Sequence, residues 1–598
     1  MKNIFTLLFL FQSLFSQYTI KSPYLQTPEK LFGYVDSCAK FWVKAYDPVY
    51  GGFFVNINRQ GGHTSPDLKN SLNQSRDAYG LTRAFQLTGD TSYLRYARGG
   101  LDFMYKYAWD NTNGGWYTES NNNGSPKSPT AVKTAYYQHY AALGITASFE
   151  ATRDTNDWNW LMKSYAYNDA KLWDSSPSTF GYYDYVAANG TNPTDKTFNA
   201  TVDAITTHVL HLYLMTGEEK YMTRLLALAD NMVNHLAASS LTQQIGFAES
   251  YTTSWQMKSS TSNDEQRTIM GHVLKTAWCL GRIYQLHNDP VYLSTAEMLV
   301  QNVLDKGYDQ QNGGPYKDYN RITGAMMMYG ISDTAKAWWQ MEQAVTAGMM
   351  LYQLTGKEKY LKMADETLDF FLNYFADHVY GDVFENTNKY GGMIPQWGTT
   401  KGGTGKAGYH SIETGYYSYL YGKLLVKKEP ATLYYSINAL PQLRQMRMRP
   451  IDVPDGYLKI TSVQLNGASY SNFDSSNLLL TLPSNTSGIF TVTYAPTNNI
   501  TVVRSDRSVP QEFVLQQNYP NPFNPSTTIG FTLSVSGFAS LKVYDLLGKE
   551  VAVLVNEQLD AGIRYQRTFT ASTLAGGTYF YVLRTGSKVD VKKMILLK

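Results

Sequence analysis

The sequence predicts a mainly α-helical protein: a closed (α/α)6 toroid, followed by a small β-rich module and a C-terminal β-sandwich. Three observations predict this order. A glycine turn followed by an aromatic residue recurs six times, about every 65 residues. Segments with a helical spacing of apolar residues fill the intervals between these turns. From about residue 430 onward, short runs of alternating apolar residues replace the helical pattern.

The six turns define the repeats of the toroid. They are Gly52-Phe53, Gly115-Trp116, Gly181-Tyr182, Gly246-Phe247, Gly314 with Tyr316, and Gly381 with Phe384. A second, polar landmark falls between successive turns, as at Thr88-Gly89-Asp90 and Thr355-Gly356-Lys357. Two landmarks in each repeat imply two helices in each repeat, and about twelve helices between residues 28 and 427. Six repeats without obvious polar caps favour a closed ring over an open solenoid, with the glycine-aromatic loops at one end.

The N-terminus predicts export. Lys2 precedes a short apolar run, Ile4 to Phe15, and small residues flank a cleavage point before Gln17. We expect a signal peptide over residues 1–16, with a buried helix of the mature protein as the alternative. No other segment approaches ~18 continuous apolar residues, so no transmembrane segment is expected in the mature chain. The toroid should occupy residues 17–429, the β-rich module 430–496, a linker 497–508 and the last domain 509–598.

Composition excludes some partners. Lys+Arg 52 against Asp+Glu 49 leaves a net charge of +3, without a long charged run. This distribution argues against nucleic acid as a partner. Two cysteines, Cys38 and Cys279, are too few for a disulfide scaffold. We expect both to be small buried residues that act as hydrophobic side chains, and a disulfide between them is the alternative. The 48 Tyr and 11 Trp suit stacking on sugar faces, although packing between helices explains most of them.

The last ninety residues carry a specific pattern. It consists of Gln517 to Pro525, Val543 to Glu550 and a terminal Lys592-Lys593-Met594. This pattern closely resembles the C-terminal sorting domain of the type IX secretion system. The resemblance implies passage across an outer membrane, the type IX machinery as a partner, removal of the domain, and a secreted or cell-surface location.

Two histidines are the first candidates for catalysis. In a toroid the active site gathers at the mouth of the inner ring, where the inner helices begin. His272 follows Gly271 at one predicted helix start, and His410 lies close to Gly408 at another. Histidine has an unperturbed pKa near neutrality, so two histidines across a pocket suit proton shuttling. A structural role is the alternative for each of them.

Two further clusters begin inner helices. Gln74-Ser75-Arg76 with Tyr79 places a guanidinium where it could hold an oxyanion or sugar hydroxyls. Trp338-Trp339-Gln340-Met341-Glu342 pairs an aromatic platform with a carboxylate. A solvated helix start with an aromatic residue in the core is the alternative for both clusters.

No metal site is expected. His208 and His211 lie three residues apart with Asp203 a turn earlier, but a metal there would need an outside ligand, and no HExxH-like spacing occurs. The chain also lacks a glycine-rich phosphate loop after a strand and any nucleotide or flavin motif. We therefore expect chemistry without a cofactor.

At these residues the toroid resembles the N-acylglucosamine 2-epimerase family, which includes cellobiose 2-epimerases, over roughly residues 30 to 427. Gln74-Ser75-Arg76, Gly271-His272 leading to Trp278, Trp338-Trp339 with Glu342, and Tyr409-His410 carry the resemblance. It implies proton abstraction at C2 of a ring-opened sugar, an enediolate, and return of the proton to the opposite face. His272 and His410 would be the acid/base pair and Arg76 would stabilise the oxyanion. The substrate-binding residues implied are Tyr79, Asp203, Trp339, Glu342 and Lys275.

Two positions depart from the family pattern. The family's glutamate three residues after the first histidine is Lys275 here, and a cation there should weaken His272 as a base. The family's Met-His pair on the central helix falls near Asp203 and Ala204. The resemblance therefore predicts the fold more firmly than it predicts the reaction.

The function expected first is a secreted sugar epimerase or isomerase acting on a free reducing end. The second is a glycoside hydrolase on the same toroid, with two carboxylates about 5 to 9 Å apart. Its candidate carboxylates are Asp77, Asp203, Glu249, Asp264, Glu265, Glu342, Asp382 and Glu385. A glycan-binding protein without activity and a polysaccharide lyase, with Tyr79 or His272 as base, are the remaining alternatives. All of them imply a mono- or oligosaccharide partner.

Overall fold

The structure, a computed structural model, describes residues 18–597 except 239–247, 259–265, 322, 324–326, 329–330, 333, 498–512, 519, 536, 560–563 and 587. The predicted signal peptide, the glycine turn at Gly246-Phe247, most of the predicted linker, and Asp264 and Glu265 lie outside the described residues. The chain divides into two compact units, Met1–Val502 and Val503–Lys598.

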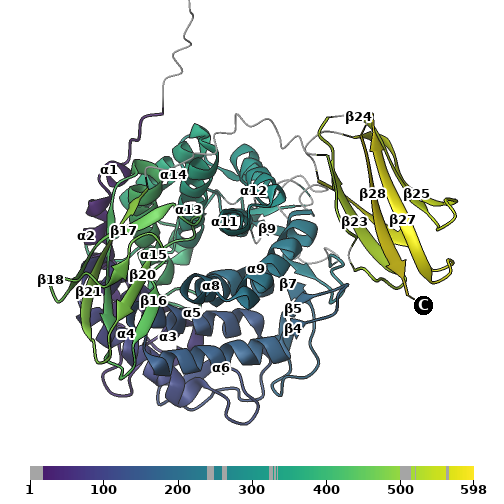
Figure 1. Cartoon of the computed structure of the whole chain (residues 1–598). Coiled ribbons are helices and arrows are strands. Elements are labelled where there is room, and N and C mark those ends of the chain that lie inside the picture. The colour runs from purple at the N-terminus through teal and green to yellow at the C-terminus, as the bar shows by residue number, and fades with distance from the viewer. Residues whose placement is uncertain are drawn as a thin grey trace, which may run out of the picture. The chain divides into compact units, whose positions relative to one another are not determined.

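The first unit contains the predicted ring of helices (Figure 1). Its inner helices are α3 (Ser71–Thr88), α5 (Ala135–Thr152), α7 with α8 (Phe198–Ala204 and Leu210–Thr216, joined by the π-helical segment Ile205–Val209), α11 (Met270–His287), α13 (Trp338–Thr355) and α15 (Gly408–Tyr421). Its outer helices are α2 (Leu31–Val43), α4 (Ser92–Phe103), α6 (Thr155–Lys171), α9 (Glu219–Asn231), α12 (Pro290–Asn302) and α14 (Glu358–Phe370). Helix α15 packs against both α13 and α3, so the ring is closed. The predicted (α/α)6 toroid is confirmed.

Local chemistry explains where the inner helices begin and end. Thr134 and Thr197 cap α5 and α7 by accepting a backbone N–H with their hydroxyls. The polar landmarks are C-caps: Gly89, Gly217 and Gly356 end their helices with φ values of 75°, 70° and 68°. Glycine adopts this left-handed conformation without the steric cost of a Cβ atom. The second sequence landmark is therefore the end of an inner helix.

Short strand pairs join neighbouring repeats at the opposite end, in front of the inner helices. They are β1–β2 (Leu68–Asn70, Glu119–Asn121), β3–β6 (Lys133–Thr134, Tyr185–Val186), β7–β8 (Lys196–Thr197, Ser250–Tyr251), β9–β10 (Arg267–Ile269, Asp318–Asn320) and β13–β14 (Lys336–Ala337, Asn386–Thr387). Each strand pair links the segment before one inner helix to the loop before the next. Strands β9 and β13 end directly before Met270 and Trp338, the residues at which α11 and α13 begin.

Buried ion pairs reinforce the same loops in five repeats. They are Lys69–Asp47 (2.7 Å), Lys133–Asp110 (2.7 Å), Lys196–Asp174 (2.9 Å), Lys336–Asp309 (3.0 Å) and Lys401–Asp377 (2.8 Å). Each lysine also donates to a backbone carbonyl of the turn, such as that of Gly313 at 2.6 Å. A buried ammonium is tolerated only when it is paired and hydrogen-bonded in this way. A repeated lysine–aspartate ion pair thus stabilises the loops at the mouth of the ring.

The β-rich module belongs to the first unit. Strands β15 (Ala431–Ile437), β21 (Gly488–Pro496), β17 (Leu458–Leu465) and β18 (Ala468–Ser469) form one antiparallel sheet, in that order. Strands β16 (Arg444–Arg447), β20 (Leu479–Leu482) and β19 (Phe473–Asp474) form a second sheet. The module shares one hydrophobic core with the helices and contacts α3, α5 and α8. Because Tyr434 lies against the C-cap Gly89, the module covers the end of the ring away from the mouth.

The second unit is a β-sandwich with its own core. One sheet has the order β22 (Val514–Leu515), β23 (Ser526–Thr532), β26 (Arg564–Thr570). The other has the order β25 (Glu550–Leu559), β24 (Gly537–Tyr544), β27 (Gly577–Thr585), β28 (Lys588–Leu596), and every strand pair is antiparallel. This arrangement confirms the predicted C-terminal sandwich.

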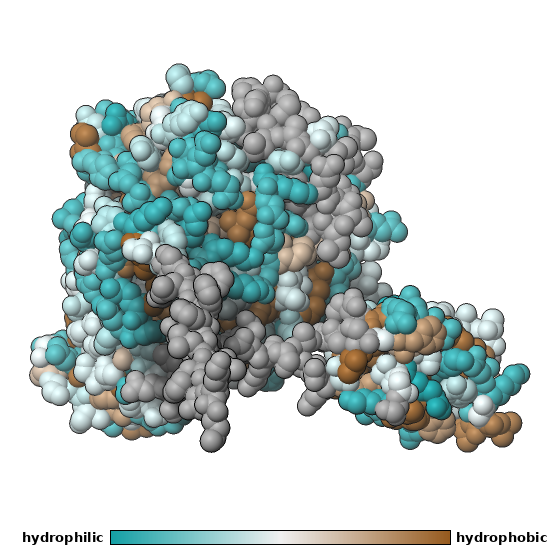
Figure 2. All heavy atoms as spheres, turned by 90° about the horizontal axis from the view of Figure 1, so that it is seen from above, coloured by the Kyte–Doolittle hydropathy of each residue, from teal (hydrophilic) through white to brown (hydrophobic). Residues whose placement is uncertain are grey.

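The two cysteines do not form a disulfide. Cys38 and Cys279 are both free and buried, as expected for small hydrophobic residues. Within the described part of the chain, no helix has the length and apolar character needed to cross a bilayer. On the face seen in Figure 2, hydrophobic residues form small separate patches among hydrophilic ones.

Candidate active site

A cavity of about 280 Å³ opens where the inner helices begin. Each inner helix lines it with residues of its first two turns. The lining residues are Arg76, Tyr136, Tyr140, Asn199, Asp203, His272, Lys275, Trp338, Trp339 and His410, with Gly405 from the loop before α15. A larger cavity of about 390 Å³ lies in the β-rich module, but no histidine or aromatic residue lines it. The smaller cavity therefore holds the candidate chemistry.

Six of the eight residues predicted for the site line this cavity: Arg76, Asp203, His272, Lys275, Trp339 and His410. The other two, Tyr79 and Glu342, are buried next to it. Tyr79 is 1% exposed, and its hydroxyl donates to Glu413 at 2.7 Å. Glu342 is also 1% exposed and contacts His410. The structure thus places Tyr79 and Glu342 behind the cavity wall.

His410 forms a buried pair with Glu342. The Nδ1 atom of His410 lies 2.8 Å from Oε2 of Glu342, and the ring of Tyr409 lies 4.0 Å from the imidazole. Burial, together with the cations Arg76, Lys275 and Lys406, lowers the pKa of His410 well below its usual range. Burial and the neighbouring Glu413 raise the pKa of Glu342 well above its usual range. Since Nδ1 is engaged, Nε2 is the nitrogen left for the cavity.

His272 forms a second histidine–carboxylate pair, nearer the rim. Its Nδ1 lies 2.8 Å from Oε2 of Glu249, and the ring of Phe198 stacks on it at a centroid distance of 3.7 Å. Trp339 lies 5.2 Å from the same imidazole. The sequence predicts Glu249 only as a candidate carboxylate of a glycoside hydrolase. No local pattern joins it to His272, because the two residues lie 23 positions apart on a loop and a helix.

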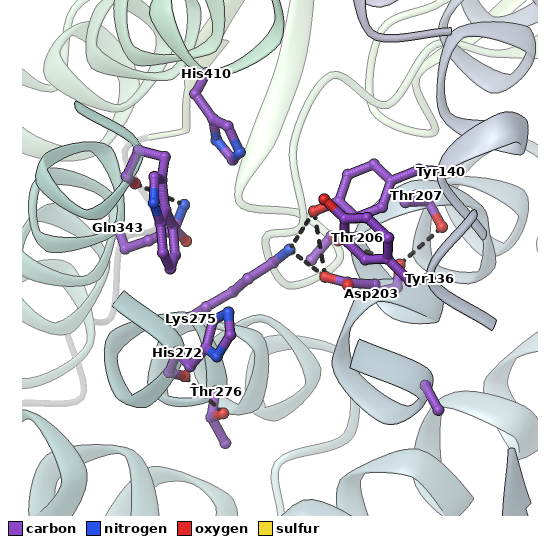
Figure 3. A network of polar contacts seen from close by, with 12 residues as sticks. Tyr136, Tyr140, Asp203, Thr206, Thr207, His272, Lys275, Thr276, Gln343 and His410 are labelled. Carbon is purple, nitrogen blue, oxygen red and sulfur yellow. Dashed lines mark hydrogen bonds and ion pairs between the residues drawn. The ribbon is translucent and has the colours of Figure 1, made fainter. Parts of the chain in front are cut away.

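The two departures from the family pattern form one ion pair. The ammonium of Lys275 lies 2.6 Å from Oδ1 of Asp203 and donates to the hydroxyl of Tyr140 at 3.1 Å (Figure 3). Burial lowers the pKa of Lys275, but Asp203 and Tyr140 outweigh it, and the net shift is upward. Lys275 therefore stays charged. Its charge is paired with the carboxylate of Asp203.

Arg76 links helix α5 to the loop before α15 at the cavity wall. It donates to the carbonyl of Gly405 and to the hydroxyl of Tyr136, the latter at 3.0 Å. Its guanidinium lies over the ring of Tyr140, 4.2 Å from the centroid. Burial lowers the pKa of Arg76, but the surrounding tyrosine hydroxyls outweigh it, and the net shift is upward. A fixed cation thus borders the cavity.

Three of the candidate carboxylates, Asp203, Asp77 and Asp382, each have a partner on at least one oxygen. Asp203 is the single carboxylate among the described lining residues, and it binds Lys275. Asp77 accepts the backbone N–H of Gly408 at 2.8 Å, and Asp382 binds Lys406 at 2.7 Å. The described residues present no pair of free carboxylates across the cavity, which the hydrolase alternative would require.

One buried group could accept a metal ion. Donor atoms of Glu342, His410 and Glu413 lie within 4.8 Å of one another, the one such group in the described part of the chain. His410 lines the cavity, Glu342 and Glu413 are buried next to it, and the hydroxyl of Tyr79 and the imidazole of His410 already contact these carboxylates. His208 and His211 do not join it: His208 contacts the hydroxyl of Thr207 at 2.8 Å, and His211 lies 3.3 Å from Glu150.

Comparisons with known proteins point to one family. The family N-acylglucosamine 2-epimerase (GlcNAc 2-epimerase) matches residues 52–413, and the secretion system C-terminal sorting domain matches residues 517–597. A D-mannose isomerase from Marinomonas mediterranea is 20% identical over 375 residues, which cover 61% of this chain and 90% of that protein. A cellobiose 2-epimerase from Eubacterium cellulosolvens is 22% identical over 401 residues, covering 60% and 91%. The crystal structure of a D-mannose isomerase has the same fold, with a TM-score of 0.59, 18% identity, and coverage of 67% of this chain and 100% of that one.

Proposed function

The chain belongs to the N-acylglucosamine 2-epimerase family, and from that premise we propose that it is an exported epimerase or isomerase that acts at C2 of a reducing-end sugar through an enediolate. The observation that supports this most directly is the pair of histidines facing one cavity. Each has its Nδ1 held by a carboxylate at 2.8 Å, which leaves Nε2 for a substrate. Figure 3 shows the rings of His272 and His410 on different sides of the space that Lys275 crosses.

The environments of the two histidines suggest different roles. His272 faces the carboxylate of Glu249, which only accepts, so its Nδ1 carries the hydrogen and its Nε2 has a lone pair. The raised pKa of Glu342 favours its protonated form, and in the proposed mechanism this proton lies between Glu342 and Nδ1 of His410. Nε2 of His410 then carries the other hydrogen. Two titratable pairs whose environments differ in this way suit a base and an acid.

The reaction follows from this asymmetry. Nε2 of His272 takes the proton from C2 of the ring-opened aldose, and the C–H electrons form a C1=C2 double bond while the carbonyl oxygen gains the negative charge. Arg76 supplies a fixed positive charge for this oxyanion. His410 delivers its Nε2 proton to the other face of C2, which inverts the centre, while the proton of Glu342 moves to Nδ1 of His410 so that the imidazole stays neutral. A later exchange with solvent removes the proton gained by His272 and returns one to Glu342. Delivery to C1 instead, with transfer of the C2 hydroxyl proton to the oxygen on C1, converts the aldose into a ketose.

The remaining lining residues suit a sugar. Oδ2 of Asp203 is buried and has no hydrogen-bond partner among the described residues, so it can accept a sugar hydroxyl. Trp339 and Tyr136 provide aromatic faces for sugar C–H groups. These features support recognition of a polyhydroxylated substrate. They do not select one sugar over another.

The C-terminal domain is a type IX sorting domain, and it indicates export across the outer membrane to a secreted or cell-surface location. An enzyme there meets sugars outside the cell. We infer that its substrate is a reducing-end sugar or oligosaccharide available in that space.

The test is NMR of the purified protein in D2O with cellobiose, mannobiose, glucose, mannose and N-acetylglucosamine. Deuterium appearing at C2 of a substrate supports enediolate chemistry, and the product identifies epimerisation or conversion to a ketose. Cleavage of a disaccharide with C2 still protonated would indicate a hydrolase. Binding without exchange or cleavage would indicate a glycan-binding relative.

A further inference from the structure

A carboxylate from another repeat holds His272. We propose that Glu249 is the positioning residue for His272, taking the place of the glutamate that the family pattern carries three residues after this histidine. The inference rests on the proposed function, because it assigns Glu249 a part in proton transfer at the same site. Lys275 occupies the family position in this chain.

Both oxygens of the Glu249 carboxylate are engaged. Oε2 lies 2.8 Å from Nδ1 of His272, and Oε1 accepts the backbone N–H of Ile269 at 3.3 Å. Ile269 is the residue just before α11, the helix that carries His272. The carboxylate is therefore anchored to the start of the same helix. These two contacts fix the side-chain conformation of Glu249, and with it the orientation of the carboxylate toward the imidazole.

Strand pairing delivers this carboxylate together with a second contact. Strand β8 follows Glu249 directly and pairs with β7, and the backbone carbonyl of Glu249 accepts the N–H of Phe198 at 3.1 Å. The ring of Phe198 stacks on His272 with an interplanar angle of 17°. One strand pair thus positions both the carboxylate at the edge of the imidazole and the aromatic ring on its face. Together they fix the orientation of His272.

Helix α11 cannot supply this acceptor itself. Position 275 lies one turn after His272 on the same face of the helix, but a lysine ammonium has donors only. Lys275 instead reaches Asp203, which lies 72 positions away on α7. The site therefore contains one ion pair, Lys275–Asp203, and a separate histidine–carboxylate pair, and the carboxylate for His272 must come from outside α11.

The consequence is chemical. A carboxylate at Nδ1 fixes the tautomer that leaves the lone pair on Nε2, and it stabilises the imidazolium that forms when Nε2 takes the C2 proton. No atom is consumed: the proton passes from C2 to Nε2 and leaves again to solvent, while Glu249 stays ionised. Without Glu249, Nδ1 and Nε2 would compete for the single hydrogen.

The experiment uses three variants of the full-length chain. Glu249→Gln removes the charge, Glu249→Asp keeps a carboxylate on a shorter side chain, and Glu218→Gln is the matched control. Glu218 lies between α8 and α9, 45% exposed, and pairs only with surface Lys220. The measurements are kcat and KM for C2 deuterium exchange, and the tautomer of His272 by NMR of 15N-histidine, assigned with His272→Gln.

We expect Glu249→Gln to lose the Nδ1–H preference of His272 and to lower kcat about 10- to 100-fold, with KM within about threefold of wild type. Glu249→Asp should recover part of kcat, and Glu218→Gln should match wild type. An unchanged His272 tautomer, or an unchanged kcat in an active enzyme, overturns the proposal. If the wild type exchanges no proton at C2, the proposed function fails, and the tautomer measurement alone decides the role of Glu249. If Glu249→Gln does not fold, Glu249→Asp carries the same comparison.

Discussion

The two histidine–carboxylate pairs differ in depth and in the origin of the carboxylate. The side chains of His410 and Glu342 are 7% and 1% exposed, and both residues lie on neighbouring inner helices, α15 and α13. Those of His272 and Glu249 are 14% and 15% exposed, and Glu249 comes from a loop. The distance between the paired atoms is 2.8 Å in both cases. The same local geometry is thus built in two different environments.

In the proposed mechanism, the same histidine–carboxylate contact has two roles, and the difference in burial separates them. Burial disfavours the charged forms, and it shifts the pKa of Glu342 upward and that of His410 downward. In the proposed mechanism the buried pair holds the proton that it donates. The pair at the rim keeps its carboxylate in contact with solvent, and its histidine is proposed to present a lone pair. In that mechanism, depth in the toroid separates the acid from the base more than residue type does.

The largest expected effect is loss of either histidine. His272→Ala and His410→Ala should each reduce kcat for C2 exchange about 10³-fold or more, because each removes one of the two proton-transfer groups. Thermal unfolding should stay nearly unchanged. Rates and unfolding temperatures of both variants check this. A large loss of stability in both would mark them as structural histidines and end the comparison.

Breaking the ion pair that separates the two histidines should come next. Lys275→Met leaves Asp203 buried without its cation and should lower the free energy of unfolding by about 3 to 5 kcal/mol. The double variant Lys275→Met with Asp203→Leu removes both charges and should restore most of that loss. Urea unfolding of both variants measures it. An equal loss in the single and double variants would contradict a compensated pair.

The pH dependence sharpens the contrast between the pairs. As pH rises through the raised pKa of Glu342, the buried pair loses its proton, Nε2 of His410 loses its hydrogen, and the rate should fall. Glu342→Gln cannot ionise, so it should flatten this alkaline fall while lowering kcat about 10- to 100-fold. Rate profiles of the two proteins between pH 5 and 10 test this. An alkaline limb that persists in Glu342→Gln would assign the proton elsewhere.

Glu342 should also make the stability of the folded protein decrease as pH rises. The folded state holds a proton on Glu342 that the unfolded state releases above its ordinary pKa. Stability from this group is therefore lost as pH rises from that value toward the raised folded pKa. Glu342→Gln should remove this slope, as measured by unfolding at several pH values. An unchanged slope would show that Glu342 is ionised in the folded protein.

The smallest expected effect is removal of the second unit. Both pairs lie in the first unit, and each unit has its own hydrophobic core. A chain that ends at Val502 should therefore keep kcat within about twofold and keep the unfolding temperature of the toroid. Activity and calorimetry of the shortened chain measure both. A marked loss of activity would mean that the C-terminal domain takes part in turnover.

Much of the site could be predicted from the sequence because it repeats with the fold. His272 and His410 are each the third residue of their helix, and Arg76, Asp203 and Lys275 are each the sixth of theirs. Equivalent positions in repeated hairpins face the same cavity, so placing the helix starts also placed these side chains. Alignment of the repeats by helix start would have added Tyr140, the sixth residue of α5. Tyr79 and Glu342 were recognised by type, but their helical phase turns them away from the cavity.

By itself, the sequence determined the six helical hairpins, the glycine ends of three inner helices, the C-terminal sandwich and the two candidate histidines, because caps, turns and helical periodicity act between residues a few positions apart. Only the tertiary structure decided the partners. Glu249 meets His272 across 23 positions, Glu342 meets His410 across 68, and Asp203 meets Lys275 across 72. These contacts depend on how the ring closes and how the loops pair, and a buried charge binds whichever opposite group the packing brings within reach. The partners, and with them the proposed division into acid and base, therefore depend on the folded ring.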